Sequence, residues 1–259
     1  MTKTHGKRKW WYELGRYLIP VLLILLWEIT YWIAGETAMA SPWQSVRDLI
    51  ANFSGWLPDV GESLLALIVS FLIAAIFGSI LGFLIGLNGF WTRTLHPLII
   101  GLYSIPKVTL YPIFLLIFGL SMQGRVAFSV FHGIFPIMIM CMQATRMVPK
   151  TYLKVAEVYR LNFFQKVHRI LIPSIMPQLV AGLRMGFSLC FLGLIIAEMF
   201  ASSRGLGFKL MHYMSLNRTS SILALILIIV FVAFFCTFLF LLWQERVEKR
   251  IGKTGTASS

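Results

Sequence analysis

Five ionisable side chains interrupt otherwise apolar stretches of this sequence, and they are the residues best placed to do chemistry: Glu28, Lys107, His132, Arg184 and Glu198. A charge inside a membrane is costly and usually faces a bundle interior or a water-filled path. Lys107, His132 and Glu198 are therefore candidate residues of a translocation pathway. Other roles stay open: exposure at the end of a span for Glu28 and Glu198, a side chain that reaches the interface for Arg184, and a hydrogen bond within the bundle for His132.

No catalytic motif accompanies these residues. The sequence has no H-E-x-x-H zinc motif, no G-x-S-x-G nucleophile motif and no G-x-x-x-x-G-K-[ST] phosphate loop. The three cysteines, Cys141, Cys190 and Cys236, stand at unrelated spacings in apolar stretches, which indicates packing rather than a disulfide framework or a metal site. We expect a protein that is not an enzyme and holds no metal, and any ATP it depends on must be bound by another chain.

The composition is that of a membrane protein. Hydrophobic residues make up 58% of the 259 residues and charged residues 13%, whereas soluble domains carry about 25% charged residues. The net charge of +13 could suit nucleic acid, but the cations gather at the ends of apolar stretches. We therefore expect a protein that crosses the membrane several times, is surrounded by membrane lipid and has no nucleic-acid partner.

Six apolar windows set the expected architecture, since a membrane helix needs about 20 residues. They are 17–34, 64–87, 98–119, 126–145, 179–200 and 222–243. The expected fold is an all-α membrane protein with about six transmembrane helices, in a domain over 17–245. Pro106 and Pro112 interrupt the third window, so that helix is expected to be kinked or broken. Residues 41–53 predict a short amphipathic helix on the outer membrane surface.

Lysine and arginine set the expected orientation, because they concentrate on the cytoplasmic side of membrane proteins. With a cytoplasmic N-terminus, sixteen of them fall in cytoplasmic segments and five in external segments. Both termini are then cytoplasmic. They are the basic segment 1–16, which we do not expect to be a cleaved signal, and a tail over 246–259 that is expected to be disordered. The half-polar segment 148–172 also faces the cytoplasm.

The second window carries small residues at every fourth position: Ser70, Ala74, Gly78, Gly82 and Gly86. Positions four apart lie on one face of a helix, so these residues form a stripe along which another helix can approach closely. The stripe predicts helix packing through Gly78, Gly82 and Gly86. It is neutral about function, since any compact bundle could use it.

The segment 148–172 predicts two short helices joined by a turn. Tyr152, Val155 and Tyr159 recur at helical spacing with Ala156, which indicates one amphipathic helix. Asn162 can cap a second helix, with Gln165 reaching back in a capping box. The apolar side chains of this segment suit either a hairpin on the membrane surface or a docking site for a soluble partner.

This segment resembles the "EAA" coupling loop of permease subunits from binding-protein-dependent ABC importers. The stretches around it resemble the nitrate/sulfonate/taurine branch of that family, in the same order, over about residues 40–245. They are "SPWQSVRDL", "GESLLALIVSFLIAAIFGSILGFLIGL", "IPKVTLYPIFLLIFGL", "LIPSIMPQLVAGLRMGFSLCFLGLIIAEMF" and "RGLGFKLM".

The resemblance implies a type I ABC importer permease fold with cytoplasmic coupling helices, in a bacterial plasma (inner) membrane. It implies cytoplasmic ABC ATPases that use ATP and Mg, a second permease that is a copy or a paralogue of this chain, and an external solute-binding protein. This chain would bind no cofactor itself. The coupling loop, 148–172, would supply the ATPase-coupling interface: Tyr152, Lys154, Val155, Ala156, Glu157, Tyr159, Arg160, Leu161, Asn162 and Phe163.

The coupling loop departs from the family pattern E-A-A-x-x-x-G at two positions. Counted back from Pro173, Lys154 occupies the glutamate position and Arg160 the glycine position. A glycine there would suit a left-handed turn, in which any other residue costs about 1 kcal/mol or more. The turn is therefore either rebuilt in this chain or docks on a partner adapted to it.

Two other functions remain open. An ion-coupled secondary carrier would explain the buried charges but not the polar cytoplasmic segment, and such carriers usually contain inverted repeats, which we do not find. A non-transporting membrane scaffold is the second. For an importer, the resemblance implies a small-molecule substrate such as a sulfonate, taurine, nitrate or a heteroaromatic nutrient, and Lys107 would suit an anion.

Overall fold

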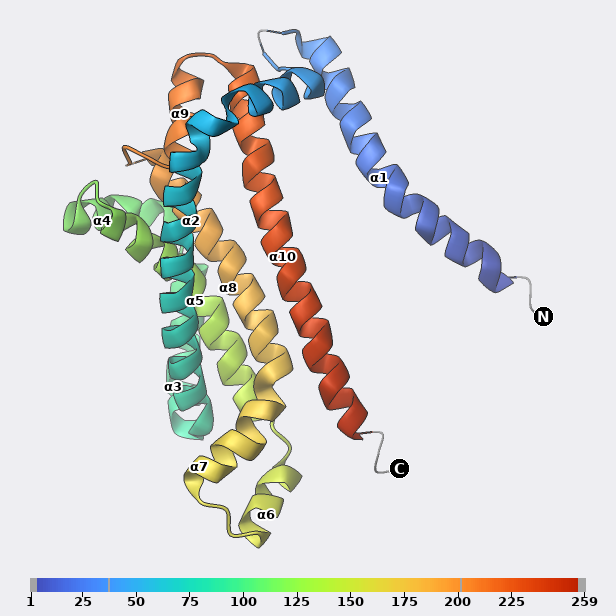
Figure 1. The fold of residues 1–259 in the computed structure, drawn as a ribbon. Helices are drawn as coiled ribbons and strands as arrows, with labels where there is room; N and C mark the ends of the chain where they lie inside the picture. The colour runs from blue at the N-terminus through green and yellow to red at the C-terminus, as the bar shows by residue number, and fades with distance from the viewer. Residues whose placement is uncertain (1–3, 37, 201, 256–259) are drawn as a thin grey trace. The chain divides into compact units, whose positions relative to one another are not determined.

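The computed structural model describes residues 4–36, 38–200 and 202–255, and the side chains of 18–36, 38–200 and 202–249. All regular structure in these residues is helical (Figure 1), which confirms the expected all-α fold. The helices are α1 (Thr4–Ala34), α2 (Pro42–Leu87), α3 (Gly89–Ser104), α4 (Tyr111–Phe118), α5 (Met122–Met147), α6 (Lys150–Val158), α7 (Phe163–Lys166), α8 (Ile172–Phe200), α9 (Leu206–Ser215) and α10 (Thr219–Gly255), with a 3-10 turn at Lys107–Leu110 and a π-helical turn at Val167–Leu171.

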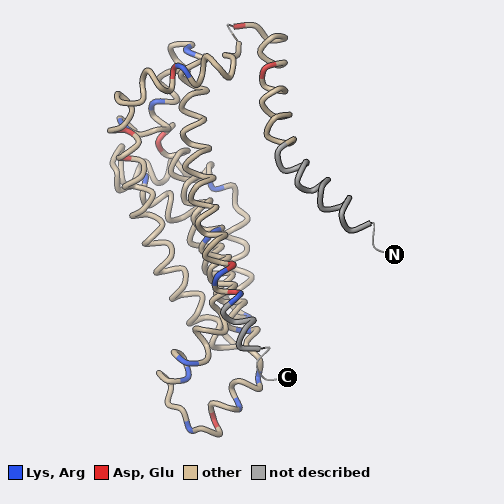
Figure 2. Tube along the Cα trace, turned by 45° about the vertical axis from the view of Figure 1, so that its right-hand side comes forward, with Lys and Arg blue, Asp and Glu red and all other residues tan. Residues whose placement is uncertain are grey.

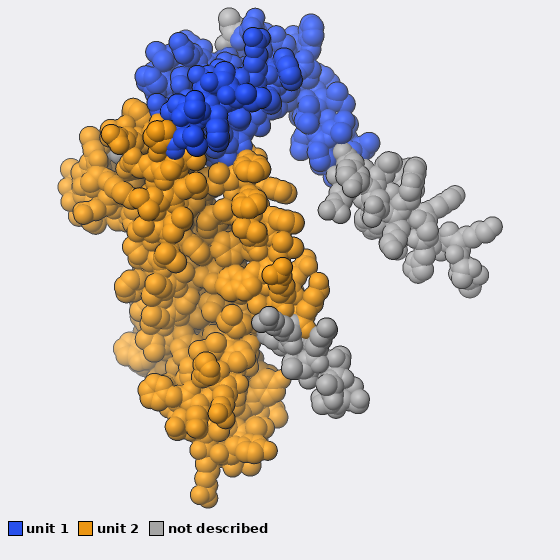
Figure 3. All heavy atoms as spheres, viewed as in Figure 1, with its two compact units in different colours: residues 1–57, 209–229 blue, residues 58–208, 230–259 orange. Residues whose placement is uncertain are grey.

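The chain divides into two compact units, which Figure 3 colours separately. Unit 1 comprises residues 1–57 and 209–229, and unit 2 comprises residues 58–208 and 230–259. Unit 2 contains the whole of α3 to α8, and therefore the coupling loop and the three candidate pathway residues.

Four helical stretches in the described residues are long and apolar enough to cross a membrane: Pro42–Leu87, Met122–Met147, Phe163–Phe200 and Thr219–Lys249. A fifth crossing is possible if the pair Gly89–Ser104 and Lys107–Phe118 counts as one span. The first expected window, 17–34, lies in α1, where the apolar stretch Leu18–Ala34 is shorter than these spans. The structure thus confirms a membrane protein built of helices, with four or five such spans where the sequence predicted about six.

The third expected span is broken at Pro106. The two helices on either side of the break meet at an angle of 84°. Ile105, the residue before the proline, leaves the helical region with φ −63° and ψ 134°, because a following proline disfavours the helical conformation. Pro112 acts differently from the expectation: it lies in the first turn of α4, where its missing N–H costs nothing.

The small-residue stripe of α2 lies against α5 in unit 2. A Cβ atom added at Gly78 would stand 3.0 Å from the carbonyl oxygen of Ile134, and one added at Gly86 would stand 2.8 Å from that of Met142. At Gly82 it would stand 2.9 Å from the Cβ of Cys141. The two backbones therefore approach so closely that a Cβ would collide with α5 at Gly82 and Gly86 and would be tightly packed at Gly78.

Helices α5 and α8 approach each other in the same way. A Cβ atom on Gly133 would stand 2.6 Å from the carbonyl oxygen of Gly186. Beside this contact, the Oγ of Ser129 donates to the carbonyl of Cys190 at 2.8 Å and lies 2.8 Å from the Oγ of Ser70 in α2. Helix α5 therefore packs closely against both α2 and α8, and Ser129 contacts both of them.

The ends of the chain and the expected surface helix differ from the sequence expectations. Helix α10 continues to Gly255, so residues 246–255 are helical where disorder was expected, and 256–259 lie outside the described residues. Of the basic segment 1–16, residues 4–16 begin α1 but their side chains, like the whole of 1–3, lie outside the description. Residues 42–53 are not a separate helix but the first part of α2.

Candidate functional site

The coupling loop folds as the predicted pair of short helices, α6 and α7. Helix α6 ends in two hydrogen bonds of a Schellman motif: the N–H of Leu161 donates to the carbonyl of Ala156 and that of Arg160 to Glu157, both at 2.9 Å. Arg160 stands at the left-handed position of this motif, with φ 49°. The turn is therefore not rebuilt: arginine adopts the conformation that favours glycine.

Helix α7 begins in the capping box predicted from the sequence. The side-chain oxygen of Asn162 accepts from the N–H of Gln165 at 2.9 Å, and the side-chain oxygen of Gln165 accepts from the N–H of Asn162 at 3.1 Å. Both orphan donors at this helix start are satisfied. The turn between α6 and α7 is thus held by backbone and side-chain hydrogen bonds on both sides.

The base of the coupling loop is anchored in a buried apolar cluster. Leu153 of α6 and Val167 of the π-helical turn pack against a buried cluster. The cluster consists of Cys141 and Ala144 of α5, Val148 just after α5, Leu171 of the π-helical turn and Ile175 of α8. The loop is therefore connected to these two helices through side chains as well as through the chain itself.

The outer side of the loop exposes apolar side chains. Between residues 152 and 164, six of them are exposed: Tyr152, Val155, Val158, Tyr159, Phe163 and Phe164. Val158 and Phe164 are among the most exposed, at 80% and 81%, yet neither is in the interface expected from the sequence. Figure 2 shows charged residues along the same loop, below long stretches of uncharged helix. The loop thus presents a mixed apolar and charged surface at one end of unit 2.

Ala156 does not belong to that exposed surface. The sequence places it in the interface, but the residue is only 1% exposed, and α6 packs on the π-helical turn. Leu161 is half-buried, whereas the polar interface candidates, Lys154, Glu157, Arg160 and Asn162, are exposed as expected. The helical spacing predicted this helix, but it could not tell the exposed face from the face turned inward.

Lys107 lies at the break between α3 and α4 and is half-buried. Its Nζ donates to the carbonyl of Tyr103 at 2.8 Å and stands 4.3 Å from the centre of the Tyr103 ring. The ring of Phe135 in α5 lies farther away, at 5.8 Å. The ammonium group is therefore held by a carbonyl and aromatic faces, which compensate part of its desolvation.

His132 is buried between α5 and α8. Its Nδ1 is 3.1 Å from the carbonyl oxygen of Phe128, so this nitrogen carries the proton and donates. The ring lies against Phe128 and against Gly193, where an added Cβ would stand 2.8 Å from the imidazole Cγ. This arrangement matches the alternative of a histidine hydrogen-bonded within the bundle.

Glu198 is fully buried and belongs to a polar cluster near the end of α8. The Oγ of Ser63 in α2 donates to its carboxylate at 2.7 Å, and the N–H of Gly207 donates to it at 2.9 Å. Arg125 of α5 lies 3.6 Å away through Nη1. Burial excludes the alternative of an exposed interfacial carboxylate.

Arg125 completes this cluster. In the sequence it is one of the five lysines and arginines that fall in external segments. It is 5% exposed, and its Nη2 forms an ion pair with Glu62 at 2.6 Å. Its Nη1 donates to the carbonyl of Arg204 at 3.2 Å. The glycine turn 204–207 is thus held by Arg125 and Glu198. In the sequence, only the "RGLG" motif indicated this turn.

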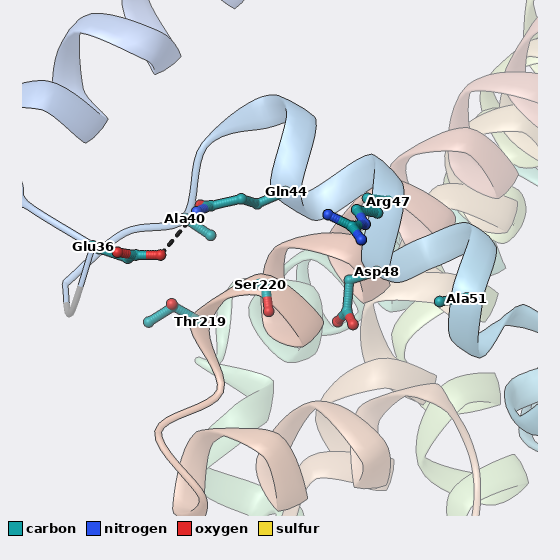
Figure 4. A pocket seen from close by; sticks show the side chains of 8 residues that line it. All are labelled: Glu36, Ala40, Gln44, Arg47, Asp48, Ala51, Thr219 and Ser220. Atoms are coloured by element: carbon teal, nitrogen blue, oxygen red, sulfur yellow. Dashed lines mark hydrogen bonds between the residues drawn. The ribbon is translucent and has the colours of Figure 1, made fainter.

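A polar pocket of about 310 Å³ lies in unit 1 (Figure 4). It is lined by Glu36, Ala40, Gln44, Arg47, Asp48, Ala51, Thr219 and Ser220. Within it, Gln44 donates to Glu36 at 2.9 Å. None of the three candidate pathway residues lines this pocket.

Comparison with known proteins relates this chain to transport permeases. Residues 74–253 match the family described as binding-protein-dependent transport system inner membrane component. The aliphatic sulfonates transport permease SsuC of Bacillus subtilis is 25% identical over 87% of this chain and 83% of its own length. The nitrate import permease NrtB of a Synechocystis species is 31% identical over 72% of each chain.

A chain of the inward-facing methionine ABC transporter MetNI shares the fold, with a TM-score of 0.65 and 19% identity over 74% of this chain and 95% of that chain. The expected type I importer permease fold is thereby confirmed.

Proposed function

Since this chain belongs to the family of binding-protein-dependent transport system inner membrane components, it is a transport permease, and we propose that it forms one half of the membrane path of an ATP-driven importer. In this proposal the second half is another permease, either a copy or a paralogue. Cytoplasmic ABC ATPases use ATP and Mg on its behalf, and an external binding protein delivers the solute. The chain lies in a bacterial inner membrane with both termini in the cytoplasm.

The substrate class follows from the relatives' names. Relatives that match this chain are described as permeases for aliphatic sulfonates, nitrate and formylaminopyrimidine. We propose a small organic or inorganic anion, or a heteroaromatic nutrient, as the solute. The half-buried ammonium of Lys107 supports an anion if the path runs beside the break between α3 and α4.

The coupling loop carries the proposed mechanism. Its turn is fixed by the Schellman motif and the capping box, and its base is anchored between α5 and α8. A movement of the loop would therefore displace both helices, because the loop itself would deform little. The exposed apolar side chains give an ATPase a surface to bind, and Lys154 and Arg160 could form ion pairs with acidic groups at the edge of the ATPase surface.

The observation that carries this proposal is the exposed apolar tip of the loop, and its removal is the test. We expect the double variant Tyr159→Ala/Phe164→Ala to lower recovery of the ATPase when the complex is purified through this chain. Phe234→Ala is the matched control, because Phe234 is 71% exposed on α10, far along the chain from the loop. Equal recovery from wild type and the double variant would contradict the docking role.

A transport assay distinguishes the importer from the ion-coupled carrier. An importer requires ATP and the binding protein, so reconstituted vesicles without ATP should show no uptake. Uptake by this chain alone, without ATP, would instead support an ion-coupled carrier and refute the proposal.

A further inference from the structure

A second pocket lies in unit 2, at the end where α2 turns into α3 and where α5 leads into the coupling loop. Its volume is about 470 Å³. It is lined by Thr92, Arg93, His96, Pro97, Met142, Gln143 and Arg146. The lining residues come from two helices, α3 and α5, so the pocket lies between helices rather than on one of them.

The pocket is positively charged without a counter-ion. Arg93 and Arg146 bring two guanidinium groups from α3 and α5, and His96 adds an imidazole. No acidic side chain lines the pocket, and no ion pair in the described part of the chain involves either arginine. Arg93 is oriented by its Nε, which donates to the carbonyl of Gly89 at 3.2 Å. An anion is therefore the ligand that the charges favour.

The neighbourhood of the pocket is amphipathic. Pro97 and Met142 contribute apolar walls, and Phe90 and Trp91 at the start of α3 are 62% and 50% exposed. Exposed aromatic side chains beside cations are typical of the level of lipid headgroups. Basic pockets between membrane helices on the cytoplasmic side bind anionic headgroups, and this pocket lies at the same end of unit 2 as the coupling loop.

We propose that this pocket binds the phosphate of an anionic phospholipid. The two guanidinium groups would each donate paired hydrogen bonds to phosphate oxygens, while the apolar walls would contact the glycerol and the start of the acyl chains. Free inorganic phosphate shares the charge and the hydrogen-bonding oxygens but has nothing to place against Pro97 and Met142. A bound lipid would join α3 to the end of α5 directly above the coupling loop.

The test is lipid retention by the purified full-length chain, measured by native mass spectrometry. The chain is offered phosphatidylglycerol or phosphatidylcholine with identical acyl chains. We expect wild type to retain phosphatidylglycerol preferentially, and the double variant Arg93→Gln/Arg146→Gln to lose at least about tenfold of this preference, the effect of one lost charge-assisted contact. Arg169→Gln is the control, since Arg169 is exposed in the coupling loop but does not line this pocket.

Several outcomes would overturn the proposal. They are equal retention of both lipids by wild type, unchanged preference in the double variant, and displacement of the lipid by inorganic phosphate at low concentration, which would make free phosphate the ligand. Unchanged lipid retention with reduced ATPase recovery would assign the pocket to the ATPase interface instead. If the double variant does not fold, Arg93→Lys/Arg146→Lys keeps both charges but loses the paired hydrogen bonds, so it should retain only part of the preference. The wild-type comparison of the two lipids still decides.

Discussion

Arg160 should be replaceable by glycine with a gain in stability of the coupling loop. The residue stands at the left-handed position of the Schellman motif with φ 49°. Its own N–H and that of Leu161 donate the two hydrogen bonds that end α6. In this conformation the Cβ of arginine causes steric strain, whereas glycine has no Cβ and is not strained. The variant Arg160→Gly therefore removes strain while keeping both hydrogen bonds of the motif.

The size of the effect is the difference of two terms. The left-handed conformation costs a residue with a Cβ about 1–2 kcal/mol. Glycine loses more conformational freedom on folding, and this entropy loss offsets about 0.5–1 kcal/mol of the stability gained by removing the strain. The midpoints of these two ranges differ by about 0.75 kcal/mol. We therefore expect local opening of the turn to become harder by about 0.5–1 kcal/mol, which is a two- to fivefold change in the opening equilibrium.

Hydrogen exchange followed by mass spectrometry measures this opening directly. The peptide of interest contains the N–H of Leu161, whose bond to Ala156 breaks when the motif opens. We expect exchange about two- to fivefold slower in Arg160→Gly than in wild type. Arg160→Ala is the matched control, because it removes the charge but keeps a Cβ and hence the strain. If Arg160→Gly exchanged as fast as Arg160→Ala, the strain argument would be wrong.

Three further substitutions test the packing of unit 2, each by thermal inactivation of the purified chain in detergent. Gly82→Ala should lower the transition temperature, because its Cβ would collide with α5, whereas Gly101→Ala should leave it nearly unchanged, since nothing lies within 4 Å of a Cβ there. Gly205→Ala should be more damaging, because the new Cβ would stand 2.5 Å from the carboxylate of Glu198 and the residue has φ 106°; an unchanged transition would contradict the geometry of this turn. Glu198→Gln should lower the transition temperature, because Arg125 then loses one of its two carboxylate partners, and an unchanged transition would show that the ion pair with Glu62 suffices.

Local patterns in the sequence predicted the two short helices of the coupling loop and the capping box between them. The capping box needs only Asn162 and Gln165 three residues apart. The turn position of Arg160 was implied by the resemblance to the family pattern, and its left-handed conformation is shown only by the structure. The stripe of small residues likewise predicted a close helix contact, since its spacing of four places the residues on one face. Such features depend on neighbours along the chain, which a single sequence displays.

The buried cluster around Glu198 depends on residues that are far apart along the chain, and the sequence could not reveal it. Arg125 is separated from Glu62 by 63 residues and from Arg204 by 79. Each of these residues alone resembles an ordinary charge near the end of a span. The burial of Ala156 has the same cause, because the face that α6 turns inward is decided by the helices on which it rests.

The arrangement of unit 2 indicates how a push on the coupling loop would travel. Near the start of α5, Arg125 ties α2, α5 and the turn after α8 together with ion pairs and hydrogen bonds. In the middle, glycine contacts hold α2, α5 and α8 too close to slide without collision. At the other end, α5 and α8 hold the base of the loop. Tightly packed interiors transmit displacement rather than absorb it, so we expect α2, α5 and α8 to move as one body. Under the proposed function, the opening for solute would then form between this body and the proposed second permease, and not within this chain.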